Sequence, residues 1–129
     1  MPICVIDTSA VFADLNEETG SEEARRWLRD AAISALNLQE IVSKAVDKGV
    51  PAEGISELIA ALRLDVRPLD HNLALAAGLM RDAAKRLGLS HGDRACLALA
   101  KKLDLPAVTA DRAWAEIAEA IGVEVVLIR

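Results

Sequence analysis

Short apolar runs alternate with amphipathic stretches along the whole chain. Five of the runs are rich in β-branched or small apolar residues, which is typical of buried strands. They cover residues 3–6, 33–36, 64–69, 106–110 and 123–128. Between them, apolar residues recur at helical spacing. This spacing predicts helices over residues 8–15, 21–32, 37–48, 52–64, 71–87, 92–104 and 111–120.

The residues at the ends of these stretches fit helix caps. Ser, Asn and Asp favour the N-cap because their side chains accept free amides of the first turn. Five helices have such a candidate: Ser21, Asn37, Asp70, Ser90 and Asp111. Glycine favours the position just past a helix, and three stand there: Gly49, Gly88 and Gly122.

The alternation of strand and helix predicts an α/β fold. Strands joined by helices form a parallel sheet with right-handed crossovers and helices on both faces. We therefore expect a three-layer α/β/α sandwich around a central parallel sheet. The chain has 129 residues and 53% apolar residues, which suits a single domain over residues 1–129.

The cysteines and the N-terminus indicate a compartment. Cys4 and Cys96 each lie in an apolar run and form no C-x-x-C pair, so we expect buried thiols in a reducing cytoplasm. No basic segment precedes a long apolar stretch, and no apolar run approaches about 18 residues. We expect a soluble cytoplasmic protein without a membrane partner.

The charge of the chain limits how it would bind nucleic acid. A net charge of −5 argues against a coat protein with a wholly positive surface. Local basic faces remain, such as Lys44 and Lys48, which are one helical turn apart. Phe12, Trp27 and Trp114 are the only aromatic residues and fit a core, so any nucleic acid would be held through phosphates and shape.

Four acidic residues occupy related places in the predicted fold. Asp7 follows the first strand, Glu40 lies in the first turn of the helix after the second, and Asp111 follows the fourth. Asp93 lies in the first turn of the helix after Ser90, which the topology can bring to the same edge. Ligands bind beyond the carboxyl ends of parallel strands.

Each acid also has a purely structural interpretation. Asp7 and Asp111 fit N-caps, and the pairs Asn37 with Glu40 and Ser90 with Asp93 have capping-box spacing. Taken together, carboxylates on one crevice would repel each other unless a cation compensated them. Oxygen ligands without a Cys/His set suit Mg²⁺ or Mn²⁺. The predicted chemistry is metal-assisted phosphodiester hydrolysis.

Four segments, in this order and spacing, carry a family resemblance: ICVIDTSAV, LNLQEIV, LSHGDRACLALA and AVTADRAW. The chain resembles PIN-domain ribonucleases, above all the VapC toxins of toxin–antitoxin pairs. The resemblance implies a catalytic set of four acids: Asp7, Glu40, Asp93 and Asp111. It implies Asp7 and Asp93 as the principal metal ligands, with Glu40 and Asp111 completing the pocket directly or through water.

The same resemblance implies further partners. They are an RNA substrate, a cognate VapB-like antitoxin that covers the crevice, and a second copy in a homodimer. Ser9 and Thr109 match polar positions of the pocket and are expected to donate hydrogen bonds there. His91 fits a solvated loop, while Arg94 and Arg112 fit either phosphate contacts or pairs with neighbouring acids.

Other functions compete with this interpretation. A phosphatase of the haloacid dehalogenase type also begins with a strand that ends in Asp, but it needs a second Asp where Ser9 stands. A PIN nuclease for RNA processing needs no antitoxin. A non-catalytic α/β module would use the acids only as caps and bind RNA or protein without cleaving it.

Overall fold

The computed structural model describes residues 1–129. Its strands are β1 (Cys4–Ile6), β2 (Ala31–Ser34), β3 (Asp65–Arg67), β4 (Ala107–Thr109) and β5 (Val125–Leu127). They form one sheet in the order β3-β2-β1-β4-β5, and every neighbouring pair is parallel. The predicted parallel sheet is confirmed, and β1 is its central strand.

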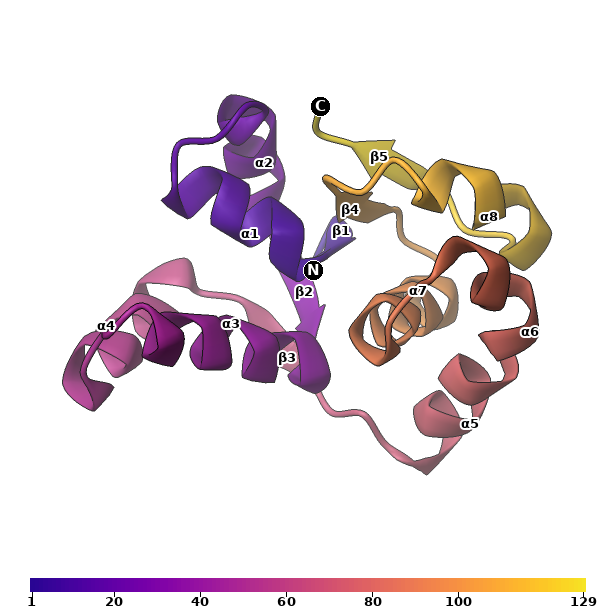
Figure 1. Cartoon of the computed structure of the whole chain (residues 1–129), viewed down its shortest axis with the longest axis horizontal. Coiled ribbons are helices and arrows are strands. Elements are labelled where there is room, and N and C mark those ends of the chain that lie inside the picture. Colours follow the sequence, from indigo (N-terminus) through magenta and orange to yellow (C-terminus); the bar gives the residue numbers. More distant parts are fainter.

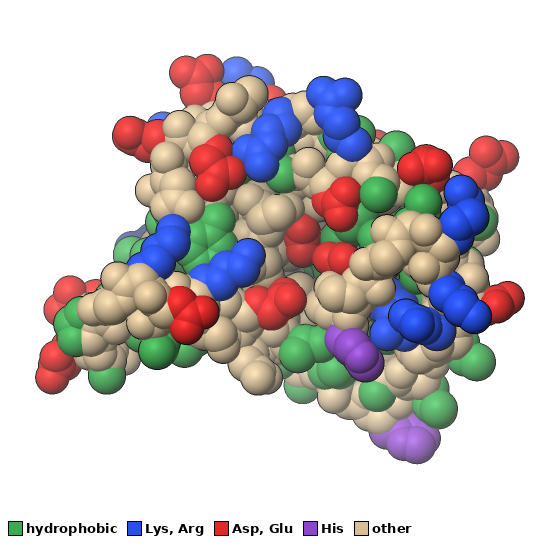
Figure 2. Space-filling model, viewed as in Figure 1, with side chains coloured by type: hydrophobic (Ala, Val, Ile, Leu, Met, Phe, Trp, Pro, Cys, Tyr) green, Lys and Arg blue, Asp and Glu red, His purple; other side chains and the backbone are tan.

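Helices cover both faces of this sheet (Figure 1). They are α1 (Thr8–Leu15), α2 (Ser21–Leu28), α3 (Ala35–Asp47), α4 (Ala52–Leu62), α5 (His71–Leu79), α6 (Arg81–Ala84), α7 (His91–Leu103) and α8 (Trp114–Ile121), with a 3₁₀ turn η1 (Lys85–Leu87). In Figure 1, α1 to α4 lie on one side of the sheet and α5 to α8 on the other. This is the predicted three-layer α/β/α fold. Figure 2 shows the same view as a surface, with acidic side chains in a hollow near its middle.

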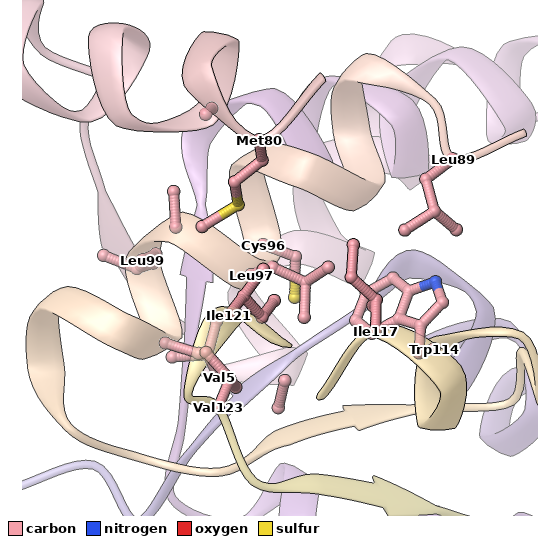
Figure 3. Packing of buried hydrophobic residues seen from close by; sticks show 14 of the residues in the cluster. Val5, Met80, Leu89, Cys96, Leu97, Leu99, Trp114, Ile117, Ile121 and Val123 are labelled. Atoms are coloured by element: carbon pink, nitrogen blue, oxygen red, sulfur yellow. The ribbon is translucent and has the colours of Figure 1, made fainter. Parts of the chain in front are cut away.

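The central strand separates two hydrophobic cores. Successive side chains of a strand point to opposite faces. Cys4 and Ile6 therefore pack under α1, α2 and α3, while Val5 packs on the other face against α7 and α8. Figure 3 shows this second core, in which the fully buried Trp114 lies beside Ile117. The two cores fix β1 from both sides.

The boundary between α2 and β2 differs from the prediction. Helix α2 ends at Leu28 instead of residue 32, and β2 begins at Ala31 instead of residue 33. Alanine suits a helix by propensity, but here Ala31 and Ala32 pair with β1, so sheet pairing overrides local preference. Ser34, not Asn37, caps α3, because the Ser34 hydroxyl accepts the Asn37 amide at 3.2 Å.

Two other predicted helices also differ. The helix expected over residues 71–87 is divided into α5, α6 and η1, with a break at Met80. Gly78 lies beside the break, where its high backbone entropy weakens the helix, and the buried Met80 side chain joins the second core. The helix expected from residue 111 begins at Trp114, because Asp111 and the next two residues form a turn.

The loop between α1 and α2 passes close to the end of the chain. Gly20 is the N-cap of α2 and has φ of 91°, so the predicted Ser21 cap is wrong and Ser21 is the first helical residue. A Cβ atom at Gly20 would lie 3.0 Å from the carbonyl carbon of Ile128. Only glycine permits this approach, which places the loop beside Arg129.

Both cysteines are buried and free, as predicted. None of the helices combines the length and the apolar character needed to cross a membrane.

Candidate active site

Asp7 lies at the carboxyl end of the central strand with only 4% of its surface exposed. It is the N-cap residue of α1, but its side chain accepts no amide of that helix, so the capping interpretation is wrong. Its Oδ2 instead accepts the hydroxyl of Ser9 at 2.6 Å and that of Thr109 at 2.9 Å. The carboxylate is thus held by hydroxyls at the sheet edge.

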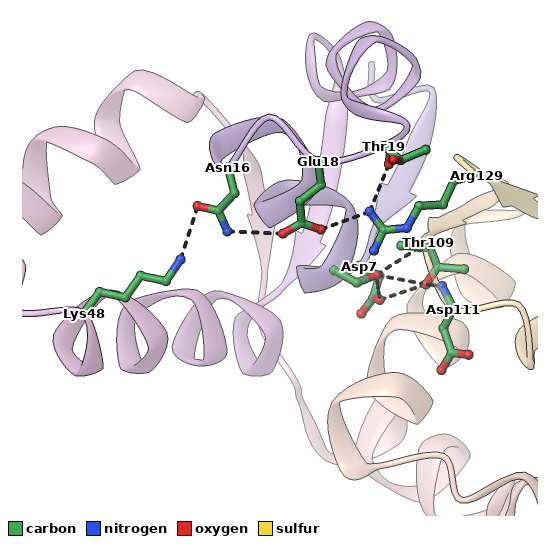
Figure 4. A network of polar contacts seen from close by, with 10 residues as sticks. Asp7, Asn16, Glu18, Thr19, Lys48, Thr109, Asp111 and Arg129 are labelled. Carbon is green, nitrogen blue, oxygen red and sulfur yellow. Dashed lines mark hydrogen bonds and ion pairs between the residues drawn. The ribbon is translucent and has the colours of Figure 1, made fainter.

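The two hydroxyls belong to a network that joins β1, α1 and β4. Ser9 Oγ lies 3.2 Å from Thr109 Oγ1 and accepts the Ala110 amide at 3.0 Å. Thr109 Oγ1 also accepts the Asp111 amide at 3.1 Å. The predicted hydrogen bonds of Ser9 and Thr109 are confirmed. Figure 4 shows Thr109 between Asp7 and Asp111, so this network sets the course of the loop after β4.

Glu40 is held in place from α1, α3 and α7. Its Oε1 accepts the Thr8 hydroxyl and the Asn37 amide group, both at 2.8 Å. The same amide nitrogen of the fully buried Asn37 donates to the Gly92 carbonyl at 3.1 Å. A Cβ atom at Gly92 would lie 2.6 Å from both Cδ and Oε1 of Glu40. The Glu40 carboxylate is therefore in direct contact with the backbone of α7 at Gly92.

Asp93 has the capping role that the spacing predicts. Its Oδ2 accepts the Ser90 amide at 2.8 Å, and its own amide donates to Ser90 Oγ at 3.1 Å, which completes the capping box of α7. Asp93 is half-buried, and its pKa is raised, first by burial and also by the charges of Asp111 and Glu40. The Asp93 carboxylate caps α7 and also interacts electrostatically with Asp111 and Glu40.

Asp111 is the most exposed of the four acids. Its Oδ1 accepts the Ala113 amide at 3.0 Å in the turn before α8, so it caps a turn and not the helix.

Burial raises the pKa of Asp7 to about 6, the Ser9 and Thr109 hydrogen bonds oppose this increase, and the charges of Asp93 and Glu40 add to it. The four acids share one electrostatic environment.

No basic side chain neutralises this acidic group. None of the ion pairs of the chain involves Asp7, Glu40, Asp93 or Asp111. No three His, Cys, Asp or Glu side chains are close enough to hold a metal ion together. Mg²⁺ needs fewer, because it binds through one or two carboxylates and keeps several waters. The oxygen-only donors and the buried Asp7 carboxylate therefore fit such an ion.

The remaining polar candidates form no ion pair with the acids. Arg94 is buried and donates to the Ala77 carbonyl at 3.4 Å, without an ion pair, so neither predicted role fits it. Arg112 and His91 are exposed. Sequence reasoning missed Thr8, Asn37 and Gly92, although the Asn37–Glu40 spacing that was interpreted as a capping box was the available signal.

Comparisons with known proteins match this architecture. The family model for the PIN domain matches residues 4–120. No curated protein sequence matches the chain significantly. The solved VapBC complex of Salmonella typhimurium bound to DNA contains a similar chain, with 21% identity, a TM-score of 0.76 and full coverage of both chains.

Two further solved structures have the same fold. One is a toxin–antitoxin complex from Klebsiella pneumoniae, with 19% identity, a TM-score of 0.76 and 98% coverage of each chain. The other is VapBC2 from Rickettsia felis bound to a promoter fragment, with 16% identity and a TM-score of 0.73. It covers 96% of this chain and 97% of that chain. At these identities the likeness establishes a shared fold.

The buried charge of Asp7 predicts a pH-dependent effect of Asp7→Asn. Because folding raises the pKa of Asp7 from 3.8 to about 6, the stabilisation due to its protonated form is fully present below pH 3.8 and is lost as pH rises through 6. Without metal, the variant should therefore gain about 2 kcal/mol of unfolding free energy relative to wild type between pH 4 and pH 7. Urea unfolding of both proteins in EDTA measures this.

The exposed Asp82 provides the control for that comparison. Asp82→Asn should differ from wild type by the same small amount at both pH values. If the difference in unfolding free energy between wild type and Asp7→Asn did not change with pH, the raised pKa of Asp7 would be contradicted.

The contact between Gly92 and Glu40 predicts a steric effect. Gly92→Ala should lower the free energy of unfolding by about 1–3 kcal/mol, because the new Cβ would overlap the Glu40 carboxylate. Gly78→Ala is the matched control, since a Cβ there meets nothing within 4 Å and alanine favours a helix. Thermal unfolding should show that Glu40→Ala relieves the Gly92→Ala effect. Equal melting temperatures for the two glycine variants would refute the close contact.

Proposed function

The chain belongs to the PIN-domain family, and we propose on this premise that it is a VapC-type toxin, a ribonuclease that requires Mg²⁺ or Mn²⁺. The observation that carries the proposal is the buried Asp7 carboxylate, which interacts electrostatically with Glu40 and Asp93 and has no ion pair with a basic side chain. Such a group repels a phosphodiester by itself. With a bound divalent cation it would instead attract one.

We assign two different roles to the four acids. Asp7 and Asp93 are the proposed ligands of the cation, and Glu40 and Asp111 complete the pocket directly or through water. When bound, the ion lowers the pKa of a coordinated water and stabilises charge on the phosphodiester. Ser9 and Thr109 keep the Asp7 carboxylate oriented, and Thr8 and Asn37 do the same for Glu40.

The proposed partners follow from charge and exposure. Two of the similar solved structures are VapBC complexes, and an uncompensated acidic pocket suits a basic side chain of a VapB-like antitoxin. Leu75 and Leu79 lie one turn apart on α5 and are 54% and 82% exposed. This apolar stripe supports a homodimer, in which a second copy would cover it.

The ribonuclease proposal is tested with the purified, antitoxin-free protein and total cellular RNA. We expect discrete cuts with Mg²⁺ or Mn²⁺ that EDTA abolishes. Asp7→Asn and Asp93→Asn should each lower the rate roughly 100-fold or more, because losing a ligand removes several kcal/mol of transition-state stabilisation. Sequencing of the RNA ends measures the cuts.

We expect the variants of that assay to keep the fold. Asparagine at position 93 retains an oxygen that can accept the Ser90 amide, so the α7 cap persists. Asp82→Asn on α6 is the matched charge control and should cleave at the wild-type rate. Full activity of Asp7→Asn, or cleavage that resists EDTA, would exclude the proposed mechanism.

The homodimer is tested through the apolar stripe. Leu79→Glu should convert the dimer to a monomer without unfolding it, because the side chain already faces solvent in one copy. Light scattering after size-exclusion chromatography measures the mass. A wild-type monomer at all concentrations, or a variant that stays dimeric, would remove this stripe from the interface.

A further inference from the structure

A groove beside the acidic site is lined by one aromatic ring, two lysines and three other polar residues. It has a volume of about 320 Å³. Its lining residues are Phe12, Asn16, Glu18, Lys44, Asp47 and Lys48. Helix α1 supplies the ring, α3 supplies Lys44, and Lys48 is the C-cap residue of α3. We call it the lysine groove.

The lysine groove continues directly from the acidic site along α1 and α3. The Thr8 hydroxyl of α1 donates to Glu40 of α3 at 2.8 Å. Further along, Lys48 donates to Asn16 Oδ1 at 3.2 Å. Lys44 and Lys48 follow Glu40 by four and eight residues, so they share its face of α3 and stand ~6 and ~12 Å from it along the axis.

Phe12 holds both lysine side chains over its ring. The Nζ atoms of Lys44 and Lys48 lie 5.3 and 4.9 Å from the ring centroid, within the range of cation–π attraction. Neither lysine forms an ion pair with a carboxylate. The ring itself is only 8% exposed, so it orders the lysines instead of offering a stacking surface for bases.

The two carboxylates of the groove differ in their partners. Glu18 accepts from Arg129 at 3.0 Å and from Asn16 at 3.3 Å, so its charge is compensated (Figure 4). Asp47 is exposed and has no ion pair. Positive charge therefore prevails locally, and Figure 2 shows lysine or arginine side chains close to the acidic hollow.

We propose that Lys44 and Lys48, held by Phe12, bind backbone phosphates of single-stranded RNA next to the scissile phosphodiester. The inference rests on the ribonuclease function proposed above. An RNA strand at the acids carries neighbouring phosphates that the acids repel, so it needs cations within a few nucleotides of the cut. The shared helix face of Glu40, Lys44 and Lys48 favours this substrate over an acidic protein segment.

Binding is tested separately from cleavage. The affinity of a fluorescent 12-nucleotide RNA is measured by anisotropy in EDTA at several salt concentrations. Lys44→Gln with Lys48→Gln should weaken binding at least ~5-fold at low salt. The slope of log K against log salt should fall by about 1.4, because each phosphate contact on a single strand contributes roughly 0.7. Lys101→Gln with Lys102→Gln, at the other end of α7, makes the same charge change and should alter neither.

Asp47→Asn provides a test of opposite sign. Removing the uncompensated carboxylate should tighten RNA binding about 2-fold or more, whereas a purely structural role of the groove predicts no gain. Equal effects of both lysine pairs, or wild-type affinity in the Lys44/Lys48 variant, would overturn the proposal. So would a variant that loses binding of a fluorescent poly-glutamate peptide but keeps that of RNA, which would assign the groove to a protein.

The two proposals fail in different ways. If the wild-type protein binds RNA through the lysines but never cleaves it with any ion, the ribonuclease function is wrong and the groove remains a binding surface. If cleavage requires Asp7 and metal but neither lysine affects RNA affinity, only the groove assignment is lost. A melting temperature of the lysine variant within a few degrees of wild type confirms that it is folded.

Discussion

The hydrogen bonds that hold the buried Asp7 carboxylate are the constraint on which the site depends. A charge at the end of the central strand is tolerable only if polar groups satisfy its oxygens. Ser9 of α1 and Thr109 of β4 both donate to Asp7 Oδ2, and these two hydroxyls also accept the Ala110 and Asp111 amides. Because hydroxyls and not cations surround Asp7, its negative charge is oriented but not neutralised. The fold thus keeps an acid whose pKa is raised to about 6, first by burial, and whose charge a bound cation would compensate.

The contact between α3 and α7 brings Glu40 and Asp93 to the acidic site. Asn37 spans the two helices, since its amide group bonds both Glu40 and the Gly92 carbonyl. Gly92 lets α7 approach Glu40 more closely than any side chain would permit. The next residue, Asp93, closes the first turn of α7 with Ser90. Asp93 lies in the first turn of α7, whereas Glu40 lies in the second turn of α3 and not in the first as predicted, because α3 begins at Ala35. The packing of these two helices fixes the spacing of the two acids.

The sequence predicts the layers of this fold well, because strand and helix periodicities alternate clearly. It fails where local preference and sheet pairing disagree, as at Ala31 and Ala32, which pair with β1 despite favouring a helix. The four acids were identified because strand ends and helix starts meet at one edge of a parallel sheet. The function of Asn37 was not, because its partner Gly92 is 55 residues away and the nearby Glu40 suggested a capping box. Local spacing does not reveal such contacts between distant segments.

An acidic nuclease must still attract a polyanion, and the range of electrostatic forces shows how this chain would do so. The Debye length is about 8 Å at physiological salt, so the overall charge of −5 is largely screened at a phosphate in the groove. The electrostatic potential at such a phosphate is set by the charges within one or two helical turns. Lys44 and Lys48 stand within that range on the face of α3 that carries Glu40, and Phe12 keeps them there. The proposed substrate affinity is therefore local, and it depends on two lysines and one ring more than on the composition of the chain.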